Sequence, residues 1–239
     1  MLEDVLLFKK QVSIQGINFY VNGKTTFLVS SDRPLKVLSS AVLGGNLRQA
    51  RYIINHSVDK NYNGSDPEQD LKQVAESLNL EQDVVGMMTA VSVTHTVLSC
   101  GSQKELSVAT LCTSGIGNPG VAGVPVSKLQ SKMQPGTINI ILLIDGNLSD
   151  SAMVNAVITA TEAKARALFK AKISLPNGEP ITGTTSDAIV VSCTGRGKSL
   201  HYAGTATDLG YLIGLTVYNA VSQGVDAYML CNKELNLTI

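Results

Sequence analysis

The sequence predicts an α/β or α+β layered sandwich, in which helices pack on a mixed, largely antiparallel sheet. Two observations favour this class: short strand-like segments dominate the first half, and strands and helices then mix without a regular βαβ repeat. A third is size, because 239 residues with 44% hydrophobic content suffice for one large core. No Pro/Ser-rich linker divides the chain, so we expect a single domain over residues 1–239.

The strands are predicted from short runs of β-branched and aromatic residues that Gly, Asn and Asp separate. In the first half these runs are 12–20, 25–29, 36–40 and 52–58. Asn22 and Gly23 lie between the first two runs and predict a hairpin, because both residues tolerate positive φ. Further on, 84–98 and 106–113 predict two long strands joined around Gly101, and the nearly continuous apolar run 137–144 predicts a buried central strand.

Three helices are predicted from capping residues followed by apolar residues at helical spacing. Asp66 caps the first helix, and Ser149 or Asp150 caps the second. Thr207 caps the last helix, whose apolar residues occupy most of its circumference. We therefore expect this last helix to be buried between layers and to end at Gly224.

Composition excludes several classes of function. The net charge is zero with acids and bases intermixed, so no footprint for nucleic acid or an anionic membrane is present. No stretch approaches the roughly 20 apolar residues of a membrane span. The first 11 residues lack the basic-then-apolar pattern of a secretory signal, and we expect a cytoplasmic protein. Four widely spaced cysteines form no CxxC, so we expect free thiols and no metal.

A glycine, three hydroxyl residues and an acid stand at the entrance of a predicted strand, in the order Gly183, Thr184, Thr185, Ser186 and Asp187. Alternate residues of an extended chain face the same way, so Thr185 and Asp187 would present a hydroxyl and a carboxylate together. The alternative is a turn whose hydroxyls bind the backbone while Asp187 caps a neighbouring group. The residues alone leave both interpretations open.

Thr161 and Glu162 lie in the Ala-rich predicted helix. Glu162 shares its face with Arg166, so one interpretation is an ordinary i,i+4 ion pair on a solvated surface. The other places Glu162 beneath a substrate amide, as a general base or as a group that orients one. Neighbouring alanines permit close packing that could bury it.

Three histidines are candidates for proton transfer near neutral pH. His56 follows Asn55 at the end of a predicted strand and is the one that we favour. His95 lies between two threonines of a predicted strand, where we expect a hydrogen-bonded structural role. His201 follows a polar turn, and we expect it at the surface, in reach of a ligand.

Two loops offer small residues for binding. At the start of the last helix, N–H groups near Gly204, Thr205 and Thr207 could hold an oxyanion or an amide carbonyl, which is compatible with capping by Thr207. The Gly- and Pro-rich run 114–136 is long for a compact domain, so we expect it to close over a bound ligand. Its Gly spacing matches neither the P-loop nor the dinucleotide fingerprint.

Four short segments, ATEAKARAL, GTTSDAIVV, INHSV and YAGTAT, together resemble the CbiZ-type adenosylcobinamide amidohydrolases, over about residues 34–227. The resemblance carries the family's Asn-His pair onto Asn55 and His56. Its Gly-Asn loop falls on Gly115 and Asn118, which we expect to form a wall or lid. Where the family commonly has Thr, this chain has Ser186, which keeps the hydroxyl.

The resemblance implies conversion of adenosylcobinamide to adenosylcobyric acid and aminopropanol in corrinoid salvage. Such hydrolysis needs a nucleophile, a proton donor and an oxyanion site. We expect His56 with Glu162 or Asp187 to transfer protons, and Thr185, Ser186 or an activated water to attack. The expected substrate-binding residues are Asn55, Gly115, Asn118, Thr161, Thr184, Gly204, Thr205 and Thr207. No cofactor or metal is expected.

Two other functions stay open. One is a non-catalytic corrinoid-binding protein, whose polar loops hold the amide arms of the ring. The other is a self-processing hydrolase with Thr161 or Thr185 as nucleophile. In each case the partner is a corrinoid small molecule, not nucleic acid or a membrane. A homo-oligomer is compatible with the sequence, which does not define the oligomeric state. Because the chain has no Trp, aliphatic side chains and hydrogen bonds would hold the ring.

Overall fold

The computed structural model describes residues 2–4, 14–80, 82–125 and 135–234. Nine strands of this described part form one mixed sheet: β1 (Leu2–Asp4), β2 (Ile17–Asn22), β3 (Thr26–Ser39), β4 (Leu47–Ser57), β5 (Val84–Thr89), β6 (Val97–Gln103), β7 (Leu106–Ser114), β9 (Ile138–Asp145) and β12 (Ala188–Cys193). Short strands form two further pairs, β8 (Pro119–Gly120) with β11 (Gly183–Thr184) and β10 (Asn147–Leu148) with β13 (Ser199–Leu200). The helices are α2 (Pro67–Ser77), α3 (Asp150–Lys170) and α4 (Asp208–Glu234), with a 3-10 turn, η1 (Val93–His95).

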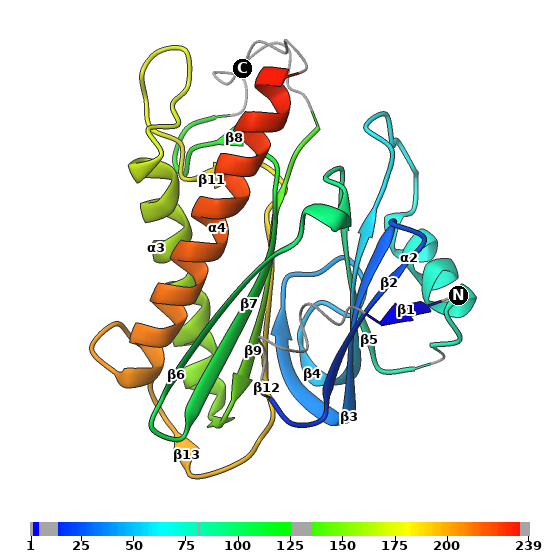
Figure 1. Ribbon diagram of the computed structural model, residues 1–239, viewed down its shortest axis with the longest axis vertical. Coiled ribbons are helices and arrows are strands. Elements are labelled where there is room, and N and C mark those ends of the chain that lie inside the picture. Colours follow the sequence, from blue (N-terminus) through cyan, green and yellow to red (C-terminus); the bar gives the residue numbers. More distant parts are fainter. Residues whose placement is uncertain (1, 5–13, 81, 126–134, 235–239) are drawn as a thin grey trace.

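The large sheet bends along β3, which creates a sandwich from a single sheet. The strand order is β1-β2-β3-β12-β9-β7-β6, and β4 joins β3 to β5. The first half of β3 pairs with β2 and its second half pairs with β12. Figure 1 shows four layers: α3 with α4, then β6, β7, β9 and β12, then β2 to β5, and finally α2. Six strand pairs are antiparallel and two are parallel, so the predicted fold class is confirmed.

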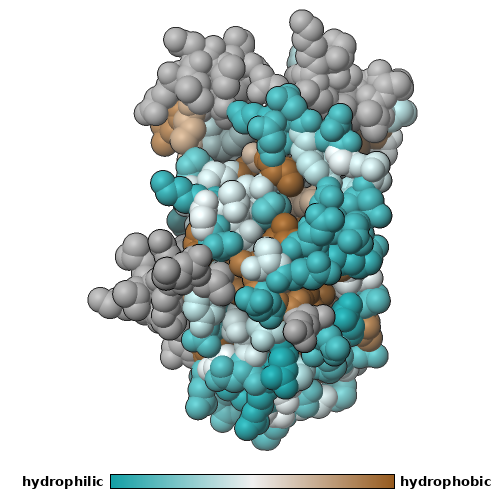
Figure 2. Space-filling view, turned by 90° about the vertical axis from the view of Figure 1, so that its right-hand side faces the viewer, coloured by the Kyte–Doolittle hydropathy of each residue, from teal (hydrophilic) through white to brown (hydrophobic). Residues whose placement is uncertain are grey.

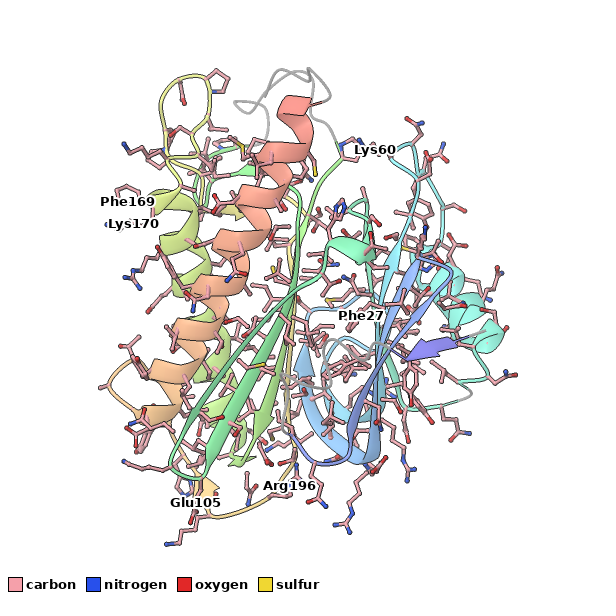
Figure 3. The ribbon with its side chains drawn as sticks, viewed as in Figure 1. Phe27, Lys60, Glu105, Phe169, Lys170 and Arg196 are labelled. Atoms are coloured by element: carbon pink, nitrogen blue, oxygen red, sulfur yellow. The ribbon has the colours of Figure 1, made fainter. Side chains whose placement is uncertain are left out.

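The apolar side chains fill three spaces between these layers. In β9, Ile140 and Leu142 face α3 and α4, whereas Ile141 and Leu143 face the other half of the sheet. Because both faces of β9 are covered, its sequence is apolar at nearly every position. Phe27 of β3 points into the middle space between the two halves of the sheet (Figure 3). The third space lies between α2 and the outer face of β3, β4 and β5.

Local signals of the sequence are confirmed at several element boundaries. The Asp66 side chain accepts a hydrogen bond from the Gln69 N–H at 3.0 Å, as an N-cap does. Ser149 caps α3 in the same way. The hairpin between β2 and β3 is also present, although its positive φ angles fall on Gly23 and Lys24, at 54° and 66°.

Two strand predictions need correction. The runs 25–29 and 36–40 are parts of one strand, β3, whose pairing with β4 shifts between Ser30 and Leu35. Pro34 falls in this irregularity, where no ladder hydrogen bond is required of it. The predicted strand 84–98 is wrong, because β5 ends at Thr89 and η1 follows. The Ser57 hydroxyl donates to Val91 O at 2.8 Å and accepts from Val93 N–H at 3.0 Å, and so replaces a strand partner.

The hairpin of β6 and β7 also differs from its prediction. It turns at Lys104, with φ 57°, and Gly101 lies within β6. A Cβ on Gly101 would lie 3.1 Å from Leu212 and 3.3 Å from Thr216, so close packing of α4 explains the glycine.

Helix α4 does not end at Gly224 as predicted, because it continues to Glu234. A Cβ at Gly224 would lie 2.5 Å from the Ser114 hydroxyl oxygen, so this glycine permits helix and sheet to approach. Tyr211 and Leu215 of α4 are 57% and 38% exposed. The expectation that α4 is buried between layers is therefore wrong, because one of its sides faces solvent.

Figure 2 shows the face that carries α2 and β2, where hydrophilic and intermediate residues dominate and hydrophobic areas are smaller. Among the described residues, no helix is both long and apolar enough to cross a membrane. The beginning of the predicted strand 12–20, part of the predicted loop 114–136 and most of the first 11 residues lie outside the described residues.

Candidate active site

Polar residues from distant segments meet at one end of the sandwich, the end that carries β8 and β11 in Figure 1. Here β4, β5 and β7 end, β9 and β12 begin, and the second half of α3 lies alongside. The INHSV and GTTSDAIVV segments both contribute to this end, and ATEAKARAL does so through Lys164.

The first of two polar groups at this end lies beside α3, and Asp187 is at its centre. Its Oδ1 accepts from Ile138 N–H at 3.0 Å and from the Thr184 hydroxyl. Its Oδ2 accepts from Thr184 N–H at 3.1 Å and from the Lys164 ammonium. A carboxylate offers about four acceptor positions, so these four donors leave none free for a substrate proton. For this carboxylate the structure shows the capping turn, the second of the two arrangements considered from sequence.

The ion pair of Lys164 and Asp187 is almost enclosed, with side chains 13% and 15% exposed. A Cβ at Gly183 would collide with the Asp187 carboxylate and lie 2.7 Å from the Lys164 ammonium nitrogen. Glycine at 183 is thus required for the pair to form. The sequence analysis did not select Lys164. Its position three residues after Thr161 places both side chains on one face of the helix, and this spacing could have identified it.

The two remaining hydroxyls of the 183–187 turn differ in their hydrogen bonds. The Asn118 amide donates to Thr185 Oγ1 at 2.9 Å and to Ser186 Oγ at 3.2 Å. The Ser186 hydroxyl in turn donates to Gly136 O at 3.2 Å. Within the described residues, the Thr185 hydroxyl has no acceptor, and the buried Oδ1 of Asn118 has no donor. Thr185 therefore keeps a proton that a ligand can use, whereas the Ser186 proton is already engaged.

A second polar group lies between the two halves of the sheet. The Asn55 amide donates to Thr113 Oγ1 at 3.0 Å and accepts from the Asn139 amide at 2.9 Å. Asn139 also donates to Met88 O at 2.8 Å. The Thr137 hydroxyl contacts Asn139 at 3.4 Å and donates to Ser186 O at 2.8 Å, which joins the two groups. Asn139 was detectable, because only Thr137 and Asn139 are polar in the run 137–144 and Asn139 alone has apolar residues on both sides.

His56 faces away from this network. Side chains alternate along β4, so Asn55 lies on the inner face with Ile53, and His56 lies on the outer face with Ile54. The His56 Nδ1 is 2.8 Å from Thr26 Oγ1, and burial lowers the pKa of this histidine below its usual 6.5. The structure therefore does not bring His56 together with Asp187.

Glu162 and Thr161 are both exposed. Glu162 has no ion pair or hydrogen bond with a described residue, and Arg166 instead lies over the Tyr218 ring at 4.6 Å. Neither the expected i,i+4 pair nor the expected burial of Glu162 is observed. The Thr161 hydroxyl donates to Val157 O at 2.8 Å and borders a small cavity beside Lys164.

The loop at the start of α4 does not belong to this end. The Thr207 hydroxyl donates to Gly204 O at 2.8 Å and accepts from Gly210 N–H at 2.9 Å, so it caps the helix. Between its start and Gly224, which lies against the end of β7, α4 rises about 24 Å at about 1.5 Å per residue. The preceding Ala203 O accepts from the Thr159 hydroxyl at 2.8 Å, so this loop lies beside the middle of α3, and none of Gly204, Thr205 and Thr207 has a hydrogen bond with Asp187.

Other predicted residues are placed as follows. Gly115 is buried, and a Cβ there would lie 2.5 Å from Val91 and 3.3 Å from Gly136, so the two loop ends approach closely. His95 is exposed in η1, which corrects the expected strand position, and His201 is exposed as expected. All four cysteines are free, and two of them are exposed. No group of three or more potential metal ligands occurs among the described residues.

Residues 10–233 match the adenosylcobinamide amidohydrolase family, also called CbiZ, and the chain belongs to this family of amidohydrolases. It is similar to an adenosylcobinamide amidohydrolase of Methanosarcina mazei, with 29% identity over 210 residues that cover 84% of this chain and 94% of the relative. It is also similar to one of Halobacterium salinarum, with 33% identity over 152 residues that cover 61% and 60%. An uncharacterized protein of Methanocaldococcus jannaschii is 27% identical over 90% of this chain and 89% of its own. The resemblance in the four short segments is thus confirmed.

Proposed function

We propose that this chain is a cytoplasmic enzyme of corrinoid salvage that hydrolyses adenosylcobinamide to adenosylcobyric acid and aminopropanol. The observation that carries the proposal is the family match over residues 10–233, which includes every segment of the polar end. Water supplies the oxygen of the new carboxyl group. The carbon–nitrogen bond breaks, and aminopropanol leaves with a proton from that water.

The hydrogen bonds support an unequal division of roles in the 183–187 turn. Thr185 is exposed and its hydroxyl proton has no acceptor among the described residues, so it is the hydroxyl that meets the substrate amide or binds the attacking water. Asn118 orients Thr185 and Ser186 from one side. Asp187 has no free acceptor position, so it holds Lys164 and the turn in place. The polar group around Asn55 stabilises the turn through Thr137, whose hydroxyl donates to Ser186 O.

The test is incubation of the purified chain with adenosylcobinamide, followed by mass analysis of the products. Release of aminopropanol supports the hydrolase, whereas tight binding with recovery of intact ligand supports a corrinoid-binding protein. Thr185→Val removes the free hydroxyl, and we expect a loss of turnover of at least about 100-fold, the size typical of a positioned polar group. Thr205→Val makes the same change in the loop before α4, which has no hydrogen bond with Asp187, and should leave the rate within about twofold.

The same preparation tests self-processing. A self-processing hydrolase would yield a cleaved chain on a denaturing gel. An intact chain that also releases aminopropanol contradicts a nucleophile created by cleavage before Thr161 or Thr185.

A further inference from the structure

A small niche lies between α3 and the first residues of β9 and β12. Its volume is about 110 Å³. Four apolar and three polar residues line it, and they are Ile138, Ile140, Ala188, Ile189, Thr161, Lys164 and Asp187. Because a water molecule occupies about 30 Å³, the niche has room for a few heavy atoms. A slender side arm fits this space, and a corrin ring does not.

The niche contains hydrogen-bond donors that no described residue uses. A lysine ammonium carries three N–H donors, and the Lys164 ammonium gives one to Asp187. Within the described part of the chain, this ammonium has no second partner, and its side chain is only 13% exposed. Enclosed donors are nearly always paired in proteins. The free donors of Lys164 are therefore available to an acceptor that enters the niche.

The ammonium is also fixed in position. Asp187, which holds it, is itself held by Ile138 and Thr184. The absence of a side chain at Gly183 leaves the space that the pair occupies. In contrast, Lys170 lies in the last turn of the same helix and is exposed to solvent (Figure 3). A donor that is held in place before the reaction stabilises developing charge better than a mobile one.

We propose that the niche binds the aminopropanol-bearing arm and that Lys164 donates a hydrogen bond to the carbonyl oxygen of the scissile amide. This assignment rests on the proposed function. When the water oxygen bonds to the carbonyl carbon, the carbonyl π electrons move to its oxygen, and Lys164 stabilises that negative charge. The electrons then return, the carbon–nitrogen bond breaks, and the amine takes a proton from the water. Lys164 keeps its own proton throughout, and the isoleucine side chains that line the niche contact the methylene and methyl groups of the arm.

The first test compares Lys164→Met with Lys170→Met. Both changes remove an ammonium group from α3, the first at an almost enclosed position and the second at an exposed one. Loss of an oxyanion donor typically lowers kcat about 100- to 1000-fold, and we expect this for Lys164→Met. Lys170→Met should stay within about twofold of wild type. A folded Lys164→Met protein, with a wild-type circular dichroism spectrum and kcat within threefold of wild type, would overturn the proposal.

A second variant covers the case in which Lys164→Met does not fold. Thr161→Leu fills the niche from an exposed helix position and leaves the ion pair untouched. We expect it to raise the KM for adenosylcobinamide about tenfold or more, since the arm can no longer enter. An unchanged KM would show that the arm binds elsewhere.

Binding separates this inference from the proposed function. If wild type releases no aminopropanol, the proposed hydrolysis fails, and titration with cobinamide decides about the niche. Affinity at least about tenfold higher for wild type than for Thr161→Leu supports arm binding without hydrolysis. Equal affinities contradict the niche.

Discussion

The substitution Asp187→Asn tests whether this carboxylate is a structural acceptor or a free catalytic base. Asparagine has nearly the same shape but replaces one acceptor oxygen by an N–H2 donor. If the new amide group takes the Oδ1 place, the Thr184 hydroxyl can turn to accept from it, but Ile138 N–H loses its acceptor. The opposite orientation directs the amide at the Lys164 ammonium and is worse.

The magnitude follows from these contacts. A buried N–H without an acceptor costs about 1–3 kcal/mol. Loss of the charge partner of Lys164 costs about 2–3 kcal/mol, below the range for a fully buried pair because the two side chains keep 13% and 15% exposure. We expect Asp187→Asn to lower the free energy of unfolding by about 4 kcal/mol, which lowers Tm by about 12 °C in a chain of this size.

The assay is urea and thermal unfolding followed by circular dichroism, with Glu162→Gln as the matched control. Glu162 is exposed and unpaired among the described residues, so Glu162→Gln should change stability by less than about 0.5 kcal/mol. An Asp187→Asn protein as stable as wild type, with turnover lost, would refute this reasoning and restore Asp187 as a proton carrier.

Three further predictions concern packing, pH and thiol reactivity. Gly210→Ala should destabilise the protein by about 2 kcal/mol or more, because the new methyl group would collide with a backbone carbonyl. Gly214→Ala, four residues later, places its methyl group where no atom lies within 4 Å and should stabilise the protein by about 0.5–1 kcal/mol. Urea unfolding of both variants measures the difference. Burial lowers the folded-state pKa of His56, so the free energy of unfolding should fall as pH drops from about 6.5 through that lower pKa. Urea titrations at several pH values should show this fall in wild type and a smaller fall in His56→Gln. Burial raises the pKa of the Cys112 thiol to about 12. A thiol reagent at about pH 8 should therefore label the exposed Cys231 and leave Cys112 unmodified, as peptide mass analysis would show.

The sequence by itself determined the features that depend on a few neighbouring residues. Asp66 and Ser149 define helix starts, because a cap needs only its own side chain and the next turn. Asn22 and Gly23 marked the hairpin for a similar reason. The apolar run 137–144 identified the central strand, since a strand covered on both faces must be apolar at every position. The four short segments also carried the family, which the match over residues 10–233 confirms.

The element boundaries that failed depend on contacts between distant segments. The run 84–98 has strand propensity throughout, but the Ser57 hydroxyl from β4 binds Val91 and Val93 and ends the strand. Gly224 looked like a helix end, because nothing nearby in the sequence reveals that Ser114 packs against it.

Only the tertiary structure decided which candidate residues meet. Asn55 and His56 are neighbours in sequence, yet the pleat of β4 sends their side chains to opposite faces. Gly204 and Asp187 both lie in family-like segments, yet the loop of Gly204 caps α4 and has no hydrogen bond with Asp187. Conversely, the bend along β3 and the packing of α3 bring Lys164 to Asp187 across the chain. Proximity across a folded sheet depends on strand order and register, and these arise from the packing of the whole core and not from any short run of residues.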